Sequence, residues 1–217
     1  MLILIMRYQE SENINEDSSN LKSNIIVITS DTQASIDTLC SCEAYTYFLS
    51  KKGFKAYHVQ EKSLTQLEKK MFEFCKLTPP QYSSISEFLS PEQISTVEFI
   101  CINISSFKDL HPTITPQNIQ GVMGNIKPDY FEHFEEEISH KHIEFVGSYS
   151  TLVAEKFRYT KTPISPQIAS ILLTGIILSL NGLEESQTTN RDFIAIEYLE
   201  QFSTISKENI NALVNQL

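Results

Sequence analysis

Two acidic residues, Asp31 and Asp37, lie six positions apart in the stretch SDTQASIDT. The stretch follows an apolar run and precedes a helical pattern, which predicts a turn between a strand and a helix. An α/β fold places its ligands at such turns, where two carboxylates could hold a divalent metal ion. An aspartate before a helix also serves as a cap or complements the helix dipole. The spacing alone leaves both interpretations open.

A second group of possible ligands lies in the stretch YFEHFEEEISHKHIEF at 130–145. His133, His140 and His142 could bind zinc, but the H-x-H pair falls at an expected helix-to-strand junction with no thiol near it in the sequence. Apolar residues recur at helical spacing before that junction. We therefore favour a solvated acidic helix with one apolar stripe over a zinc site.

The elements that must position these residues alternate between strands and helices. Short apolar runs predict strands at 24–29, 54–59, 97–104, 118–124 and 142–146. Helical patterns are found at 35–53, 63–76, 148–159, 165–180, 189–203 and 206–216. Successive βα units imply a parallel sheet. The predicted fold class is α/β, a parallel β-sheet flanked by helices with a helical C-terminal third.

Three local signals set helix boundaries within this scheme. Gly53 is expected to end the first helix, and Ser63 to cap the second. Ser165 and Pro166 are typical of a cap and a first-turn proline, so they should start the apolar helix at 165–180. The Pro- and Ser-rich stretch 78–91 is expected to be a connection.

The composition narrows the class of protein. A chain of 217 residues that is 41% hydrophobic can form one sizeable core. Its formal charge of −10 argues against a nucleic-acid partner, because polyanions attract basic surfaces. The longest apolar run, at 168–180, is too short to cross a bilayer, so no membrane association is expected.

The cysteines indicate the compartment. They form no C-x-x-C pair and lie mostly in apolar runs, which predicts buried, reduced thiols and an intracellular, cytoplasmic location. They are Cys40, Cys42, Cys75 and Cys101.

The chain is expected to comprise a flexible N-terminal segment, 1–23, and one domain, 24–217. The first six residues, MLILIM, have no basic region before them and no cleavage site after them, so they are not a signal peptide. A polar linker follows them, which would leave them able to add a strand to a sheet or contact a partner.

Three stretches of the sequence resemble motifs of a known family. SDTQASIDTLCSCEAY at 30–45 resembles the opening motif of the DHH phosphoesterases, and IEFVGSYSTLVAE at 143–155 resembles a second signature of the prune and eukaryotic exopolyphosphatase branch. The stretch 169–200 resembles a third. That branch is related to the family II inorganic pyrophosphatases. The resemblance implies the N-terminal domain of this fold, with the C-terminal substrate-binding domain of the relatives expected to be absent.

The resemblance also implies a damaged metal site. Active relatives use carboxylates and imidazoles to hold two ions, Mg²⁺ or Mn²⁺, that activate a water and neutralise a phosphoanhydride. The matching positions here are Asp31, Ser35, Asp37, Asn103, Gly124, Asn125 and Ser179, with Ile126 closing the D-H-H motif. Only Asp31 and Asp37 keep a carboxylate. We therefore expect no bound metal and no cofactor.

The same resemblance places the turn at Gly147 and Ser148 beside the relatives' phosphate site. Its position after a strand and before a helix makes Ser148 an expected N-cap. A retained anion-binding role for Gly147 and Ser148 is the alternative.

Three functions remain open. The favoured one is a catalytically inactive pseudoenzyme that acts as a protein-binding or structural subunit, or as a regulator, of a large intracellular assembly. The first alternative is a module that binds phosphate or a nucleotide in the old crevice through backbone amides. The second is a residual metal-dependent phosphohydrolase using Asp31 and Asp37.

Overall fold

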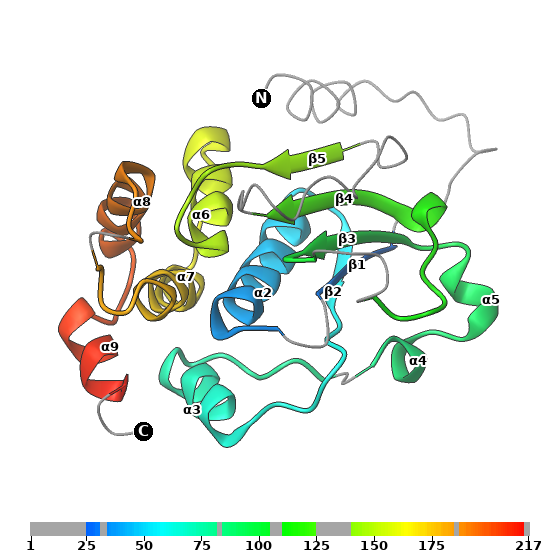
Figure 1. The fold of residues 1–217 in the computed structure, drawn as a ribbon, viewed down its shortest axis with the longest axis horizontal. Helices are drawn as coiled ribbons and strands as arrows, with labels where there is room; N and C mark the ends of the chain where they lie inside the picture. The colour runs from blue at the N-terminus through cyan, green and yellow to red at the C-terminus, as the bar shows by residue number, and fades with distance from the viewer. Residues whose placement is uncertain are drawn as a thin grey trace.

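Five parallel strands form the centre of the fold, in the order β2-β1-β3-β4-β5 (Figure 1). The computed structural model describes residues 25–30, 34–81, 84–104, 110–124, 140–184 and 187–214. The strands are β1 (Ile25–Thr29), β2 (Lys55–His58), β3 (Glu98–Ile102), β4 (Ile119–Gly124) and β5 (His140–Ile143). The predicted α/β class with a parallel sheet is confirmed.

The central strands β1 and β3 are largely continuous hydrophobic runs, because the sheet is covered on both faces there. Along β1, Ile26 and Ile28 belong to one core cluster and Val27 to another. In β3, Ile100 and Ile102 face the first cluster, whereas Phe99 faces the second. This alternation of period two buries β1 and β3 on both sides.

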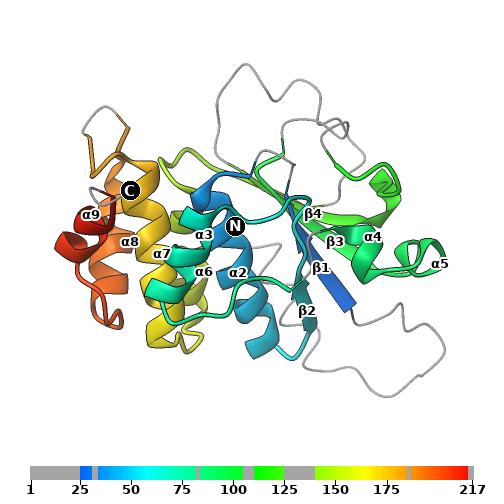
Figure 2. The same ribbon diagram turned by 90° about the horizontal axis from the view of Figure 1, so that it is seen from below.

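Helices cover the two faces unequally. The larger core lies under α2 (Ile36–Lys51), α3 (Gln66–Phe74), α6 (Tyr149–Thr160) and α7 (Pro166–Ser179). The smaller core lies under α4 (Ile85–Phe88) and α5 (Pro91–Ile94), on the opposite side of the sheet (Figure 2). A short 3₁₀ turn, η3 (Pro116–Asn118), leads into β4. The outermost helices, α8 (Asn190–Glu200) and α9 (Lys207–Val214), pack on α7 (Figure 1). The C-terminal part is helical, as predicted.

The apolar helix α7 begins where its sequence predicts. The Ser165 hydroxyl accepts a hydrogen bond from the amide of Ile168, and Pro166 occupies the first turn. Every residue from Ile168 to Ile177 is buried, so α7 is an internal helix of the domain. Within the part of the chain that the structure describes, no helix has both the length and the apolar character to span a membrane.

Several predicted boundaries shift. The second helix starts at Gln66 and is capped by Thr65 rather than Ser63, because Thr65 and Glu68 form a reciprocal capping box. The last strand covers 140–143 instead of 142–146. The connection at 78–91 contains the four-residue helix α4, capped by Ser84. The N-terminal segment 1–23, which was expected to be flexible, and the acidic helix expected before His140 lie outside the described residues.

The cysteines are buried and free, as the sequence predicts. Burial raises the pKa of Cys75 to about 11 and that of Cys101 to about 12. A thiol with so high a pKa carries almost no thiolate at neutral pH. These cysteines therefore act as core residues and not as nucleophiles.

Candidate functional site

The candidate site lies at the carboxyl ends of β1 and β3. These neighbouring strands lead to connections on opposite sides, since the chain moves from β1 to the edge strand β2 and returns to β3. In open α/β sheets this switch point is where ligands bind. Ser35 and Asp37 follow β1, and Asn103 follows β3. Asp31 lies outside the described residues.

The carboxylate of Asp37 is engaged by the start of helix α6. Its Oδ1 accepts hydrogen bonds from the Ser148 hydroxyl at 2.8 Å, the Ser150 hydroxyl at 2.6 Å and the Ser150 amide at 3.1 Å. Its Oδ2 accepts one from the Tyr149 amide at 2.7 Å. Asp37 is only 3% exposed, so its acceptor capacity is used within the protein.

This contact needs a glycine on a third helix. A Cβ added at Gly175 of α7 would lie 2.3 Å from the Ser150 hydroxyl oxygen and 3.1 Å from Oδ1 of Asp37. Gly175 therefore lets α7 approach the junction of α2 and α6 closely. Burial raises the pKa of Asp37, and the four hydrogen bonds only partly offset that effect.

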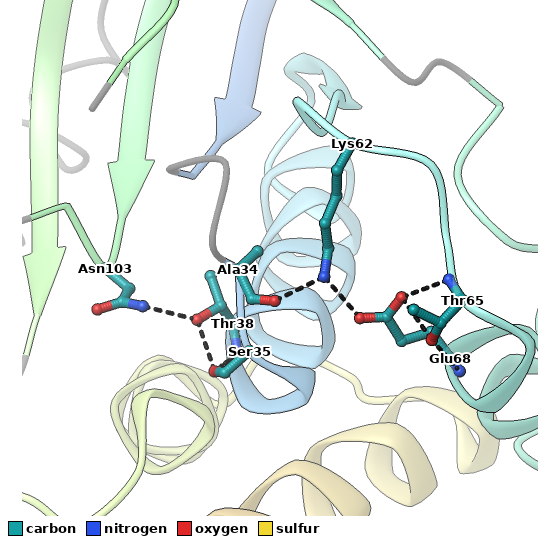
Figure 3. Close-up of polar contacts among 7 residues, drawn as sticks. All are labelled: Ala34, Ser35, Thr38, Lys62, Thr65, Glu68 and Asn103. Carbon is teal, nitrogen blue, oxygen red and sulfur yellow. Dashed lines mark hydrogen bonds and ion pairs between the residues drawn. The ribbon is translucent and has the colours of Figure 1, made fainter. Parts of the chain in front are cut away.

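Asn103 completes a second group of polar contacts at the same edge (Figure 3). It adopts a left-handed backbone conformation, with φ of 57°, which asparagine tolerates better than most residues. Its Nδ2 donates to Thr38 Oγ1 at 3.0 Å, and its Oδ1 accepts from the Tyr149 hydroxyl. Thr38 Oγ1 lies 2.9 Å from Ser35 Oγ. Ser35 also caps α2.

Two of the remaining positions that were matched to the metal ligands of the relatives are described by the structure. Gly124 ends β4, and its carbonyl accepts a hydrogen bond from the Glu144 amide at 3.2 Å. Ser179 ends α7, and its hydroxyl donates to the Gly147 carbonyl at 3.4 Å. Asn125 and Ile126 lie outside the described residues. The structure thus groups Ser35, Asp37 and Asn103, whereas Ser179 contacts the turn before α6.

The two residues predicted for anion binding contact carboxylates of the chain itself. The Gly147 amide donates to Asp192 Oδ2 at 3.0 Å, and the Ser148 hydroxyl donates to Asp37. Ser148 is also the N-cap of α6, as the sequence predicts. A role of these two residues toward an external anion stays a prediction. In the structure, Asp37 and Asp192 take the positions at the helix start that an anion would favour.

Sequence reasoning missed Asp192. Its side chain is completely buried and accepts hydrogen bonds from Thr151, Gly147 and Thr189, which joins the start of α8 to the start of α6. The available signal was the sequence Thr189-x-x-Asp192, because a hydroxyl residue followed by an acid three positions later forms a capping box. The hydrogen bond between Gly147 and Asp192 has no comparable signal in the sequence.

Lys62 brings a positive charge to the loop after β2, near the turn that precedes α2. Its Nζ donates to the Ala34 carbonyl at 2.8 Å and to Glu68 Oε1 at 2.7 Å (Figure 3). Burial acts to raise the pKa of Glu68, but hydrogen bonds from Lys62 and Thr65 lower it overall. Lys62 therefore forms an ion pair with a carboxylate of the chain itself, that of Glu68.

Lys62→Met is expected to lower the free energy of unfolding near neutral pH by about 1–2 kcal/mol, because Glu68 loses its cation. The pKa of Glu68 is lower in the folded than in the unfolded chain, so its stabilising effect is present above the ordinary value of 4.5 and is lost in acid. The difference between wild type and variant should shrink as the pH falls. Urea unfolding at neutral and acidic pH measures it, and Lys69→Met, exposed on α3, is the control. An equal difference at both pH values would contradict this account.

Two of the three histidines considered for zinc lie in β5. His140 and His142 belong to the strand itself, and His133 lies outside the described residues. Among the residues that the structure places, no three His, Cys, Asp or Glu side chains gather closely enough to hold a metal ion. The absence of a metal stays a prediction, because Asp31 and His133 are not among those residues.

Comparison with known proteins gives the fold. No family model and no curated protein matches the sequence. The structure is similar to an exopolyphosphatase-related protein from Bacteroides fragilis, with a TM-score of 0.70 and 16% identity over 100% of this chain and 60% of that one. It is also similar to a putative family II inorganic pyrophosphatase from Methanococcus jannaschii, with a TM-score of 0.68 and 15% identity over 88% of this chain and 60% of that one. The fold is DHH-like.

The two comparisons cover only part of each related structure, and at low sequence identity. The chain spans about 60% of the length of each of these two structures. Identities of 15% and 16% show a shared fold and assign no role to individual residues. Function must therefore be argued from the contacts in this chain.

Proposed function

We propose that this chain is a catalytically inactive relative of the DHH phosphoesterases that acts by binding a protein partner, as a subunit or regulator of a larger assembly. The observation that carries the proposal is the engagement of Asp37. A hard cation such as Mg²⁺ needs several oxygen ligands with free lone pairs, usually carboxylates. Both oxygens of Asp37 accept hydrogen bonds from α6 instead.

The other described positions support the same proposal. Asn103 is neutral, and both ends of its amide are hydrogen-bonded within the protein. Gly124 has no side chain, and the Ser179 hydroxyl contacts a backbone carbonyl. These residues do not fit a centre of two metal ions, which needs several charged ligands.

Protein binding is supported by the surface of the C-terminal helices. Large hydrophobic side chains that are exposed among the described residues occur mainly on or beside α6 and α8. Phe145 is 70% exposed and Tyr159 is 59% exposed. The others in this region are Phe193, Ile194 and Phe202. Exposed aromatic side chains are typical of surfaces that bind other proteins.

A hydrolysis assay tests the loss of catalysis. The purified full chain is incubated with Mg²⁺ or Mn²⁺ and either pyrophosphate or short-chain polyphosphate, and released phosphate is measured. The expected phosphate release equals that of the metal ion and substrate without the protein. Metal-dependent turnover that falls in Asp31→Asn would overturn the proposal and favour a residual phosphohydrolase.

The proposed binding of a protein partner needs a separate experiment, because an inactive protein need not have a partner. The chain is recovered from its native cells at moderate salt and sized. We expect it to elute in a stable complex whose partner is released by Phe145→Ser and retained by Tyr57→Ser, a substitution of another exposed aromatic residue on β2. A monomer with no bound protein would overturn the proposed binding of a protein partner. In that case, thermal stabilisation by a nucleotide would favour the small-ligand module.

A further inference from the structure

A connected group of aromatic rings lies where the C-terminal half of α2 packs against α6. The ring of Phe48 on α2 meets that of Phe157 on α6 edge-on, with the ring centroids 5.2 Å apart. Phe48 also stacks on Tyr45, with the centroids 5.6 Å apart. Tyr47 approaches Phe157 from the same helix, at 6.3 Å. The four rings therefore join two helices that pack side by side (Figure 1).

Three lysine side chains lie over this group of rings. A lysine ammonium within about 6 Å of a ring centroid is attracted to the face of the ring. The distances from Nζ to the centroid are 4.8 Å for Lys51 over Tyr47, 5.7 Å for Lys52 over Phe48 and 5.6 Å for Lys156 over Tyr45. Because the rings contact one another, these distances place three positive charges on one surface. We call Lys51, Lys52 and Lys156, with the four rings beneath them, the lysine–aromatic surface.

The sequence around this surface is basic, although the whole chain has a formal charge of −10. The stretches 44–60 and 156–183 contain no aspartate and no glutamate. They hold six of the 17 lysines and arginines of the chain, which are Lys51, Lys52, Lys55, Lys156, Arg158 and Lys161. A local excess of positive charge on an acidic protein attracts a negatively charged ligand to that place and not to the rest of the molecule.

Two acidic residues that border these stretches are engaged with other side chains. Oε2 of Glu43 lies 3.1 Å from Nδ1 of His58. Both oxygens of Glu155 accept hydrogen bonds from the guanidinium of Arg191, at 2.8 and 2.5 Å, and bidentate pairing of this kind is strong. Within the described part of the chain, no carboxylate forms an ion pair with a lysine of the lysine–aromatic surface.

The ammonium groups are accessible and charged. Lys51 and Lys52 are exposed, and Lys156 is partly exposed. Burial lowers the pKa of Lys156 to about 8, so most of this side chain still carries its charge at pH 7. The three side chains already lie on packed rings, so a ligand that pairs with them has less rotamer freedom to remove.

The lysine–aromatic surface adjoins the aromatic residues that support protein binding. Tyr159, which is exposed, follows Lys156 by three positions on α6, and residues at this spacing are neighbours on a helix. The guanidinium carbon of Arg158 lies 5.6 Å from the centroid of the Tyr159 ring. Helix α6 therefore carries positive charge next to an exposed aromatic side chain.

We propose that the lysine–aromatic surface is a docking site for an acidic segment of a protein partner, whose carboxylates pair with Lys51, Lys52 and Lys156. The inference rests on the proposed binding of a protein partner and names the chemistry of that partner. An acidic protein segment fits better than a nucleic acid. A long polyanion would also meet the negative charge of the rest of the chain, whereas a short run of Asp or Glu contacts this surface alone.

A binding assay with a labelled peptide of eight glutamates tests the site. The peptide is titrated with the full chain, and its fluorescence anisotropy is followed at low and at moderate salt. We expect saturable binding that weakens as the salt concentration rises. Lys51→Gln/Lys52→Gln should weaken binding by about five- to tenfold. The matched control is Lys69→Gln/Lys70→Gln, another pair of adjacent exposed lysines, on α3, which should bind like wild type.

Urea unfolding shows that both variants are folded before their binding is compared. Binding that does not saturate, or that both lysine pairs weaken equally, would overturn the site. Equal or tighter binding of single-stranded DNA of eight nucleotides would overturn the assignment to an acidic protein segment. The complex from native cells separates this inference from the proposed function. A complex that persists unchanged in Lys51→Gln/Lys52→Gln would overturn the inference alone, whereas a native chain without any partner would overturn the proposed function.

Discussion

Asp37→Asn is expected to lower the free energy of unfolding by about 3 kcal/mol. The amide that replaces one carboxylate oxygen cannot accept the hydrogen bonds that α6 donates, so buried donors lose their partner. The start of α6 also loses a buried negative charge that complements its dipole. Urea unfolding monitored by circular dichroism measures the change.

The pH dependence of the free energy of unfolding separates the effect of the Asp37 charge from the effect of packing around its side chain. Burial raises the pKa of Asp37 above its ordinary value of 3.8, so the folded chain binds its proton more readily than the unfolded chain. The part of the stability that comes from proton binding by this group is fully present below the ordinary value and is lost as the pH rises through the folded-state pKa, whereas the hydrogen bonds that the carboxylate accepts remain at neutral pH. The advantage of wild type over Asp37→Asn should therefore grow further as the pH falls through that pKa to the ordinary value of 3.8.

The control is Glu92→Gln on α5, a carboxylate that is exposed to solvent. Its unfolding curve should match that of wild type. A stable, cooperatively folded Asp37→Asn protein would show that α6 does not depend on this carboxylate, and the assignment of Asp37 as an internal anchor would fail.

Gly147→Ala is expected to cost about 2–3 kcal/mol, because the turn before α6 has no room for a side chain. An added Cβ would lie 2.4 Å from the Gln187 carbonyl oxygen, 2.5 Å from Leu180 Cδ2 and 2.9 Å from Asp192 Oδ2. Two of these neighbours cannot move without disturbing α7 or the cap of α8. Thermal and urea unfolding should both show the loss.

Gly53→Ala provides the matched control. Gly53 has a φ of +88° and no atom within 4 Å of an added Cβ, so the substitution tests backbone strain without collision. We expect it to cost about 1 kcal/mol. If Gly147→Ala cost no more than Gly53→Ala, close packing at the turn before α6 would not be needed for the fold.

The strands and several helix ends could be predicted because their signals are local. β1 and β3 are short β-branched or apolar runs, and the start of α7 is marked by the adjacent Ser165 and Pro166. The start of α3 was misplaced because Ser63 and Thr65 both suit a cap. Thr65 forms the cap because Glu68 lies three positions after it and completes the capping box.

The contacts of the candidate site could not be predicted, because they join distant parts of the chain. The sequence identifies Asp37 as a possible ligand or a cap, whereas its actual partners, Ser148 and Ser150, lie more than a hundred residues away. Their meeting depends on Gly175, whose position in α7 shows no signal in the sequence. The same limit applies to Tyr149, which reaches Asn103 across the edge of the sheet.

The central claim is the proposal that the chain holds no metal cluster, because Asp37, Asn103 and Ser179 are engaged in hydrogen bonds within the protein. A titration of the purified chain with Mn²⁺, followed by electron paramagnetic resonance of the free ion, tests it most directly. The account predicts a free-ion signal equal to that of buffer at every metal concentration. Saturable binding of about two ions per chain would contradict it, because it would show that the carboxylates and their neighbours still form a two-metal centre.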